Sequence, residues 1–203
     1  MTPWRRWRKG FVLELILIRH GLPERRDDTA DPPLSPIGHE QARRVAAWLA
    51  HERIDAIFSS TMLRARQTAE PFARRLGHEV ACHEGICEFD RDSGTYVPME
   101  ELRRDNYEAW LAMATGDHGV DIGTFQATVV ETLERIVEEQ AGKRVVVFCH
   151  GGVINVWTAH VLGMPPRLFF EPDYTSVHRY MCARTGQRNV VCLNDRGHLR
   201  ELS

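Results

Sequence analysis

The segment Leu15–Gly21 (LILIRHG) constrains the fold more than any other stretch of the chain. Its first four residues form an uninterrupted apolar run, which is typical of a short buried strand. The run stops at Arg19 and His20, and a glycine follows. A cation and an imidazole therefore lie where the strand ends, and we expect the glycine, which has no Cβ, to let a ligand approach the backbone. The pattern predicts an anion site, although an ordinary junction between a strand and a loop can have the same sequence.

A second apolar strand has the same ending. Lys143–Gly152 (KRVVVFCHGG) stops at His150, and Gly151 follows. Between the two strands, Phe58–Ala69 (FSSTMLRARQTA) ends a third strand and begins a helix that carries Arg64. Polar side chains at three strand ends indicate one site assembled from distant parts of the chain.

These segments resemble the histidine phosphatase superfamily, also called phosphoglycerate-mutase-like. Members of that family have an R-H-G motif, a downstream S-x-x-x-x-R-A-x-x-T-A-like segment and a late H-G-G. The similarity runs through nearly the whole chain. The resemblance implies the phosphoglycerate-mutase-like fold and a phosphatase or mutase activity.

Strands and helices are expected to alternate along the chain. Apart from the strands at 15–18 and 145–149, the apolar patterns predict strands at 54–59, 80–82, 177–183 and 190–193, and helices at 36–51, 61–76, 98–115, 121–140 and 153–162. Ser35 is the expected N-cap of the first helix, with Pro36 at its first position. The alternation implies a three-layer α/β/α fold with a mainly parallel central sheet. Ligands bind such sheets beyond the carboxyl ends of the strands.

The length of 203 residues fits a single domain, 1–203. We expect 1–11 to be a flexible basic tail and not a signal peptide, because Glu14 interrupts the apolar stretch and no small-residue cleavage site follows. The segment 83–119 is charged and less regular, with one predicted helix. It is therefore predicted to be a small helical insertion over the active site.

Composition restricts the partners. A net charge of −2 indicates no nucleic-acid or membrane partner, and no apolar run approaches the roughly 20 residues of a membrane span. The five cysteines are odd in number and include no C-x-x-C pair, which is typical of reduced thiols in a cytoplasmic protein. The resemblance implies a small-molecule phosphate ester as the substrate. The oligomeric state stays open, with a dimer as one option.

The residues at the strand ends suit a phosphoryl group. Arg19 and Arg64 offer planar arrays of N–H donors that match phosphate oxygens, and Arg64 lies in the first turn of a helix, where backbone N–H groups also favour an anion. His150 and Gly151 complete the predicted phosphate-binding set. A metal site is the competing use of two histidines, but zinc takes a third protein ligand, and two arginines would repel the cation. We therefore expect neither a metal nor another cofactor.

A histidine attacks phosphorus well when one ring nitrogen is unprotonated and the other donates to a fixed acceptor. Neighbouring arginine charges help to keep the ring neutral and remove the need for Mg²⁺. The residues alone do not say which histidine attacks. The resemblance implies that His20 is the nucleophile, with Arg19 and His150 beside it at the phosphate.

The family also uses an acidic residue to protonate the leaving alcohol, and the segment Gly85–Gly94 (GICEFDRDSG) offers Glu88. Glu88 stands between Cys87 and Phe89, and apolar neighbours raise the pKa of a carboxyl group toward that of a useful acid. The rivals for this role are three nearby carboxylates, Asp90, Asp92 and Glu84.

Residues 22–26 (LPERR) depart from the mutases of the family, in which a polar run with Ser or Thr and Asn follows R-H-G. The departure removes phosphate contacts that a mutase needs in order to retain and rebind its intermediate, whereas hydrolysis requires less. We therefore expect a metal-independent phosphomonoester hydrolase that works through a phosphohistidine on His20. The alternatives are a phosphoglycerate-type mutase and a non-catalytic member of the fold that binds a phospho-ligand.

Overall fold

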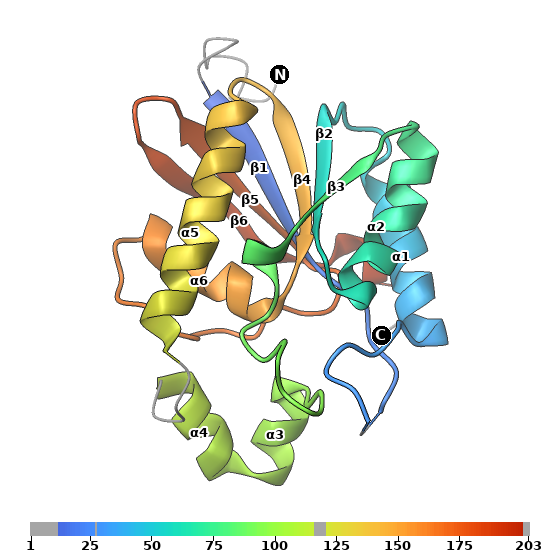
Figure 1. Cartoon of the computed structure of the whole chain (residues 1–203). Coiled ribbons are helices and arrows are strands. Elements are labelled where there is room, and N and C mark those ends of the chain that lie inside the picture. The colour runs from blue at the N-terminus through green and yellow to red at the C-terminus, as the bar shows by residue number, and fades with distance from the viewer. Residues whose placement is uncertain (1–11, 27, 116–120, 201–203) are drawn as a thin grey trace.

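The computed structural model describes residues 12–26, 28–115 and 121–200. Within these residues, six strands form one mixed sheet in the order β3-β2-β4-β1-β5-β6 (Figure 1). The strands are β1 Val12–Arg19, β2 Ala56–Ser60, β3 Val80–His83, β4 Arg144–Cys149, β5 Val177–Ala183 and β6 Arg188–Asp195. From β3 to β1 the neighbours are parallel, whereas β5 and β6 add an antiparallel edge. The predicted mainly parallel sheet is confirmed.

Helices cover both faces of this sheet. The α-helices of the described residues are α1 Pro36–Leu49, α2 Leu63–Leu76, α3 Met99–Asp105, α4 Tyr107–Thr115, α5 Ile122–Glu139 and α6 Gly151–Val161. Figure 1 shows α1 and α2 on one face, α5 and α6 on the other, and α3 with α4 beyond the end of the sheet at which β1 and β4 finish. The three-layer α/β/α architecture is therefore confirmed. None of the described helices has both the length and the apolar character that crossing a membrane requires.

The side chains of strand β1 explain why helices cover both faces of the sheet. Successive side chains of a strand point to opposite faces. Leu13, Leu15 and Leu17 belong to the core under α5 and α6, and Ile16 and Ile18 belong to the core under α1 and α2. All five side chains are at most 1% exposed. An uninterrupted apolar run is thus what a strand in the middle of three layers needs.

The register of the parallel strands positions the polar residues that follow them. Arg19 at the end of β1 pairs with Cys149 at the end of β4. The next residues, His20 and His150, therefore leave adjacent strands at the same edge, and the His20 N–H donates to the Cys149 carbonyl at 3.0 Å. β2 runs parallel to β4 on its other side and leads into α2, which carries Arg64.

The predicted helices differ from the observed ones in number at 98–115 and by one or two residues at several ends. The helix predicted at 98–115 is two helices, because Asn106 has φ −149° and ψ 82° and its side chain accepts the Ala109 N–H at 3.1 Å. Asparagine competes with the helical backbone in this way and begins a new helix. The helix predicted to begin at Val153 begins at Gly151, directly after His150. The predicted tail 1–11 and positions 116–119 of the predicted insertion lie outside the described residues.

The helix ends follow local chemistry where it was predicted. The Ser35 hydroxyl accepts the Gly38 N–H, and Pro36 is the first residue of α1. Gly77 ends α2 with φ 68°, a conformation that favours glycine. The five cysteines are free thiols, as the odd count and the absence of C-x-x-C suggested.

Candidate active site

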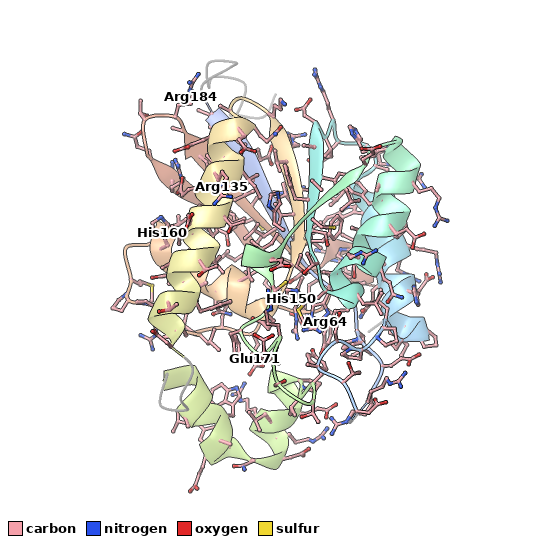
Figure 2. All side chains as sticks on the ribbon, viewed as in Figure 1. Arg64, Arg135, His150, His160, Glu171 and Arg184 are labelled. Carbon is pink, nitrogen blue, oxygen red and sulfur yellow. The ribbon has the colours of Figure 1, made fainter. Side chains whose placement is uncertain are left out.

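A cavity of about 450 Å³ lies beyond the carboxyl ends of β1 and β4. Its lining comes from the strand ends, from the segment 88–111 and from the loop 167–172. Figure 2 shows Arg64 and His150 at this end of the sheet, with Glu171 on the side toward α3 and α4. The residues singled out at separate strand ends are thus brought to one place.

His20 lines the cavity and is held in one tautomer. Its Nδ1 lies 2.8 Å from the Gly21 carbonyl oxygen. Because a carbonyl oxygen only accepts, Nδ1 carries the proton and Nε2 keeps a lone pair. Burial lowers the pKa of His20 well below its usual value, and the nearby charge of Arg64 lowers that pKa further. The ring is therefore neutral near pH 7, with Nε2 available as a nucleophile.

Arg64 is fully buried and directed at His20. Its Nε donates to His20 Nε2 at 3.2 Å, and its Nη1 donates to the Ala30 carbonyl at 3.0 Å and lies 3.3 Å from Asp31 Oδ1. The Tyr96 ring lies against the guanidinium, with 4.6 Å between the ring centroid and Cζ. The buried Nη2 has no hydrogen-bond partner among the described residues. This donor group suits an anion at the position next to His20.

Arg19 is held by the loop that precedes β5. Its Nη1 donates to the Pro172 carbonyl at 2.6 Å, and its Cζ lies 4.0 Å from the centroid of the Tyr174 ring. Gly151 lies beside it, because a Cβ built on that glycine would be 3.8 Å from Arg19 Nε. The two guanidinium groups therefore approach the site from different elements, β1 and α2.

His150 is also buried and neutral. Its Nε2 lies 2.7 Å from the Ser60 hydroxyl, whose oxygen already accepts the Met62 N–H at 3.3 Å. If the Ser60 hydroxyl donates to Nε2, the proton of the imidazole is on Nδ1. In the part of the chain that the structure describes, Nδ1 has no hydrogen-bond partner. Burial lowers the pKa of His150 well below its usual value. The centroid of the His150 ring lies 5.1 Å from the centroid of the His20 ring.

Glu88 lines the cavity and lies against the start of α6. Its Oε2 accepts the Gly152 N–H at 3.0 Å, and its Oε1 accepts the Phe89 N–H at 3.2 Å. Burial raises the pKa of Glu88 to about 7, and the charge of Asp90 acts in the same direction. A carboxyl group with this pKa can donate a proton in one step and accept one in the next at neutral pH.

The structure separates the four carboxylates that compete for the acid role. Glu88 and Asp90 line the cavity, and burial raises the pKa of Asp90 as well. Glu84 and Asp92 have side chains that are 75% and 92% exposed, and both lie near Arg91. These two residues do not line the cavity.

The expected reason for the glycine after His20 is wrong. A Cβ on Gly21 would lie 2.6 Å from the Gly38 carbonyl oxygen, so the missing side chain permits close packing on α1. The glycine that the site itself requires is Gly152. A Cβ there would lie 2.1 Å from Glu88 Oε1, and this carboxylate reaches the helix N-terminus only because that position is bare.

Sequence reasoning missed the residues that orient the predicted ones. Ser60 carried a usable signal, because it ends a strand beside the others. The remaining supports come from loops without a recognisable pattern, and they are Asp31, Tyr96, Pro172 and Tyr174. Among the described residues, no group of three or more His, Cys, Asp or Glu side chains is arranged to hold a metal ion.

Comparison with known proteins places this site in a family context. The sequence model of the histidine phosphatase superfamily (branch 1) matches residues 15–196, a range that contains all the site residues described above. Phosphoglycerate mutase-like protein 4 of Arabidopsis thaliana is 30% identical over 156 residues, which cover 70% of this chain and 68% of the relative. Phosphoserine phosphatase 1 of Hydrogenobacter thermophilus is 27% identical over 202 residues, which cover 94% of this chain and 96% of the relative.

A solved structure agrees with these sequence matches. The crystal structure of a phosphoserine phosphatase from Entamoeba histolytica, in complex with 3-phosphoglyceric acid, is similar with a TM-score of 0.76 and 26% sequence identity. The similarity covers 92% of this chain and 99% of the other.

Proposed function

The chain belongs to the histidine phosphatase superfamily, and on this premise we propose that it hydrolyses phosphate monoesters without a metal ion, through a phosphohistidine on His20. Phosphatases match it over nearly its whole length, which supports hydrolysis as the outcome. The observation that carries the proposal is the pair of contacts at His20. The Gly21 carbonyl holds the proton on Nδ1, and the Nε2 lone pair lies beside the Arg64 guanidinium.

The charges of the site fit a phosphate dianion. His20 and His150 are neutral, so Arg19 and Arg64 give two positive charges in a buried place. Arg64 Nη2 and His150 Nδ1 are donors that a phosphate oxygen would satisfy. A bound phosphoryl group would also compete with His20 Nε2 for the Arg64 Nε–H, which releases the lone pair for attack.

The reaction has two steps with one acid. In the first, His20 Nε2 forms a bond to phosphorus, the bond from phosphorus to the ester oxygen breaks, and Glu88 gives its proton to the leaving alkoxide. In the second, the Glu88 carboxylate takes a proton from water, the hydroxide attacks phosphorus, and the bond to Nε2 breaks. Inorganic phosphate and the original enzyme result, and the pKa of Glu88 near 7 suits both roles.

A phosphoglycerate-type mutase is the second candidate, because a mutase-like protein is among the relatives. The loop after His20 favours hydrolysis. Arg25 pairs with Glu101, Arg26 pairs with Asp28, and neither arginine lines the cavity. These cations are bound to carboxylates of the protein, which leaves them poorly placed to hold an intermediate.

We also propose that the chain is a single domain, in which the segment 83–119 lies over the site, and that it works in the cytoplasm. The position of the segment over the site is supported by the cavity lining, because residues 88–111 and the strand ends line the same cavity. The free cysteines support the proposal that the protein works in the cytoplasm.

Release of inorganic phosphate from p-nitrophenyl phosphate, with and without EDTA, tests the proposed function. We expect turnover that survives chelation, that His20→Ala abolishes, and that His51→Ala leaves unchanged because His51 is an exposed histidine outside the cavity. A loss on chelation that zinc or magnesium restores would revive the metal alternative. A transfer of phosphate between the positions of phosphoglycerate, without release, would favour the mutase.

A further inference from the structure

Beyond the phosphate-binding residues, most of the side chains that line the cavity walls are apolar, and the charged ones among them are Asp90, Arg103, Arg167 and Glu171. One wall comes from the segment 88–111 and the other from the loop before β5. The apolar and aromatic residues of these walls include Val97, Trp110 and Leu111 on one side and Leu168, Phe169 and Phe170 on the other. Val97 and Leu111 are 41% and 45% exposed, so a ligand in the cavity would remove apolar surface from water.

The wall formed by Phe169 and Phe170 is built in advance. Asn155 of α6 is buried, and its side-chain amide donates to the Phe170 carbonyl at 2.9 Å. Its carbonyl oxygen accepts the N–H groups of Phe169 and Phe170 at 2.8 and 3.2 Å. A second bond from this amide, to the Gly151 carbonyl at 2.9 Å, ties the wall to the first turn of α6. The two aromatic residues are thus fixed relative to the phosphate site.

Arg103 of α3 joins the two walls at the mouth. Its Nη1 lies 3.2 Å from Glu171 Oε1, and its Cζ lies 5.0 Å from the centroid of the Trp110 ring. Figure 2 places Glu171 between the strand ends and α3–α4, where this contact is made. Glu171 is thus the partner of Arg103 at the mouth, where Arg167 also lines the cavity. The Tyr107 ring stacks on the Trp110 ring, with 5.4 Å between the two ring centroids, and helps to hold Trp110 in place.

We propose that the apolar walls bind the leaving group of the substrate, so that this enzyme prefers phosphate esters of alcohols with an extended alkyl or aryl group over esters of short, charged alcohols such as phosphoserine. The proposal rests on the phosphatase function proposed above. A short ester with an ammonium and a carboxylate would lose water to Val97, Leu111 and Phe169, whose side chains offer no hydrogen bond in return. An alkyl chain or aromatic ring gains contacts with the same walls.

A series of n-alkyl phosphates from ethyl to octyl tests the proposal directly. The alkoxide leaving groups have nearly the same basicity along this series, so the chemical step stays constant and only binding changes. Each methylene that the cavity encloses should raise kcat/KM about four-fold, with a plateau once the chain fills the cavity. A series with constant kcat/KM, or phosphoserine as a better substrate than hexyl phosphate, would overturn the proposal.

Variants of the wall locate the effect. Trp110→Ala and Leu111→Ala should each lower the ratio of kcat/KM for hexyl phosphate to that for ethyl phosphate, by about ten-fold for the tryptophan. Leu162→Ala is the matched control, because Leu162 is a 52% exposed leucine that does not line the cavity, and it should leave the ratio unchanged. If Trp110→Ala fails to fold, Leu111→Ala and the wild-type series still decide. An unchanged ratio in Leu111→Ala together with a flat wild-type series rejects the assignment.

Binding of n-alkylphosphonates, measured by calorimetry on the wild-type protein, separates this proposal from the phosphatase function. These compounds have a carbon–phosphorus bond and are not hydrolysed by the mechanism above. Affinity that rises with chain length in a protein that hydrolyses no ester would support the apolar subsite and reject the catalytic function. Turnover of all the esters at one rate, with phosphonate affinity independent of chain length, would support the catalytic function and reject the apolar subsite.

Discussion

Replacement of Glu88 by glutamine tests the acid of the proposed reaction. The change keeps the size of the side chain, and the amide oxygen can still accept the Gly152 N–H that now lies 3.0 Å from Oε2. The amide cannot deliver a proton to a leaving oxygen. We therefore expect Glu88→Gln to fold normally and to lose about 10²- to 10⁴-fold in kcat/KM for ethyl phosphate, the usual range for the loss of a general acid.

The same loss should not appear with p-nitrophenyl phosphate. Its leaving group is a stable anion that needs little protonation, and kcat/KM reports only the steps up to the formation of the phosphoenzyme. The pH profile gives a second magnitude. With a pKa of about 7, the protonated fraction of Glu88 falls about ten-fold between pH 6 and pH 8. In the wild type, kcat/KM for ethyl phosphate should fall by the same factor, and in Glu88→Gln this part of the profile should vanish.

The assay is a comparison of kcat/KM for the two esters across pH, with two further variants. Glu84→Gln is the exposed control and should match the wild type, because Glu84 does not line the cavity. Asp90→Asn should shift the pH profile toward lower pH, because the charge of Asp90 raises the pKa of Glu88, and at pH values below the shifted pKa it should cause no selective loss on ethyl phosphate. Equal losses on both esters in Glu88→Gln would assign the residue a binding or folding role. A selective loss in Asp90→Asn alone would make Asp90 the acid.

Two other predictions follow from the geometry and the burial of the site. Gly152→Ala should reproduce the selective loss on ethyl phosphate, because a Cβ at 2.1 Å from Oε1 displaces the Glu88 carboxylate, whereas Gly94→Ala has open space and should be neutral in the same assay. The second concerns three buried histidines, His20, His150 and His178. Their pKa values are lowered by burial, so below pH 6.5 the unfolded chain binds protons that the folded protein does not. Glu88 opposes this as pH falls from about 7 to 4.5, because the folded protein then takes up its proton first. His198, whose pKa burial lowers to about 4, adds a fourth histidine, and Asp90, whose pKa burial raises, acts in the same direction as Glu88. Four histidine protons less two carboxyl protons leave about two, so the free energy of unfolding should fall by up to about 3 kcal/mol per pH unit between pH 6.5 and 4.5, and urea unfolding curves that coincide at pH 6.5 and 5 would contradict it.

The layers of the fold could be predicted because their signals are local. The unbroken apolar run of β1 predicts burial on both faces, and the observed cores under α1–α2 and α5–α6 share its side chains. The break at Asn106 was missed because the apolar pattern continues through it. Its cause is a single hydrogen bond from the Ala109 N–H to a side chain, which outweighs helix periodicity over one turn.

The candidate site could be predicted only as far as the strand ends. His20 and His150 follow aligned ends of parallel neighbours, so their proximity follows from the fold class. The support of Arg19 could not be predicted, because its partner is a carbonyl 153 positions away in a loop. The role of Gly21 was misread for a similar reason, since the close neighbour of that glycine is the backbone of α1 at Gly38.

Capture of the phosphoenzyme tests the central claim most directly. The protein is mixed with p-nitrophenyl phosphate, quenched in base, in which phosphohistidine is stable, and digested for mass spectrometry. We expect one phosphoryl group on His20, a larger trapped fraction in Glu88→Gln because water is no longer activated, and none in His20→Ala. Phosphate on His150 or another residue, or turnover in His20→Ala at the wild-type rate, would contradict the account.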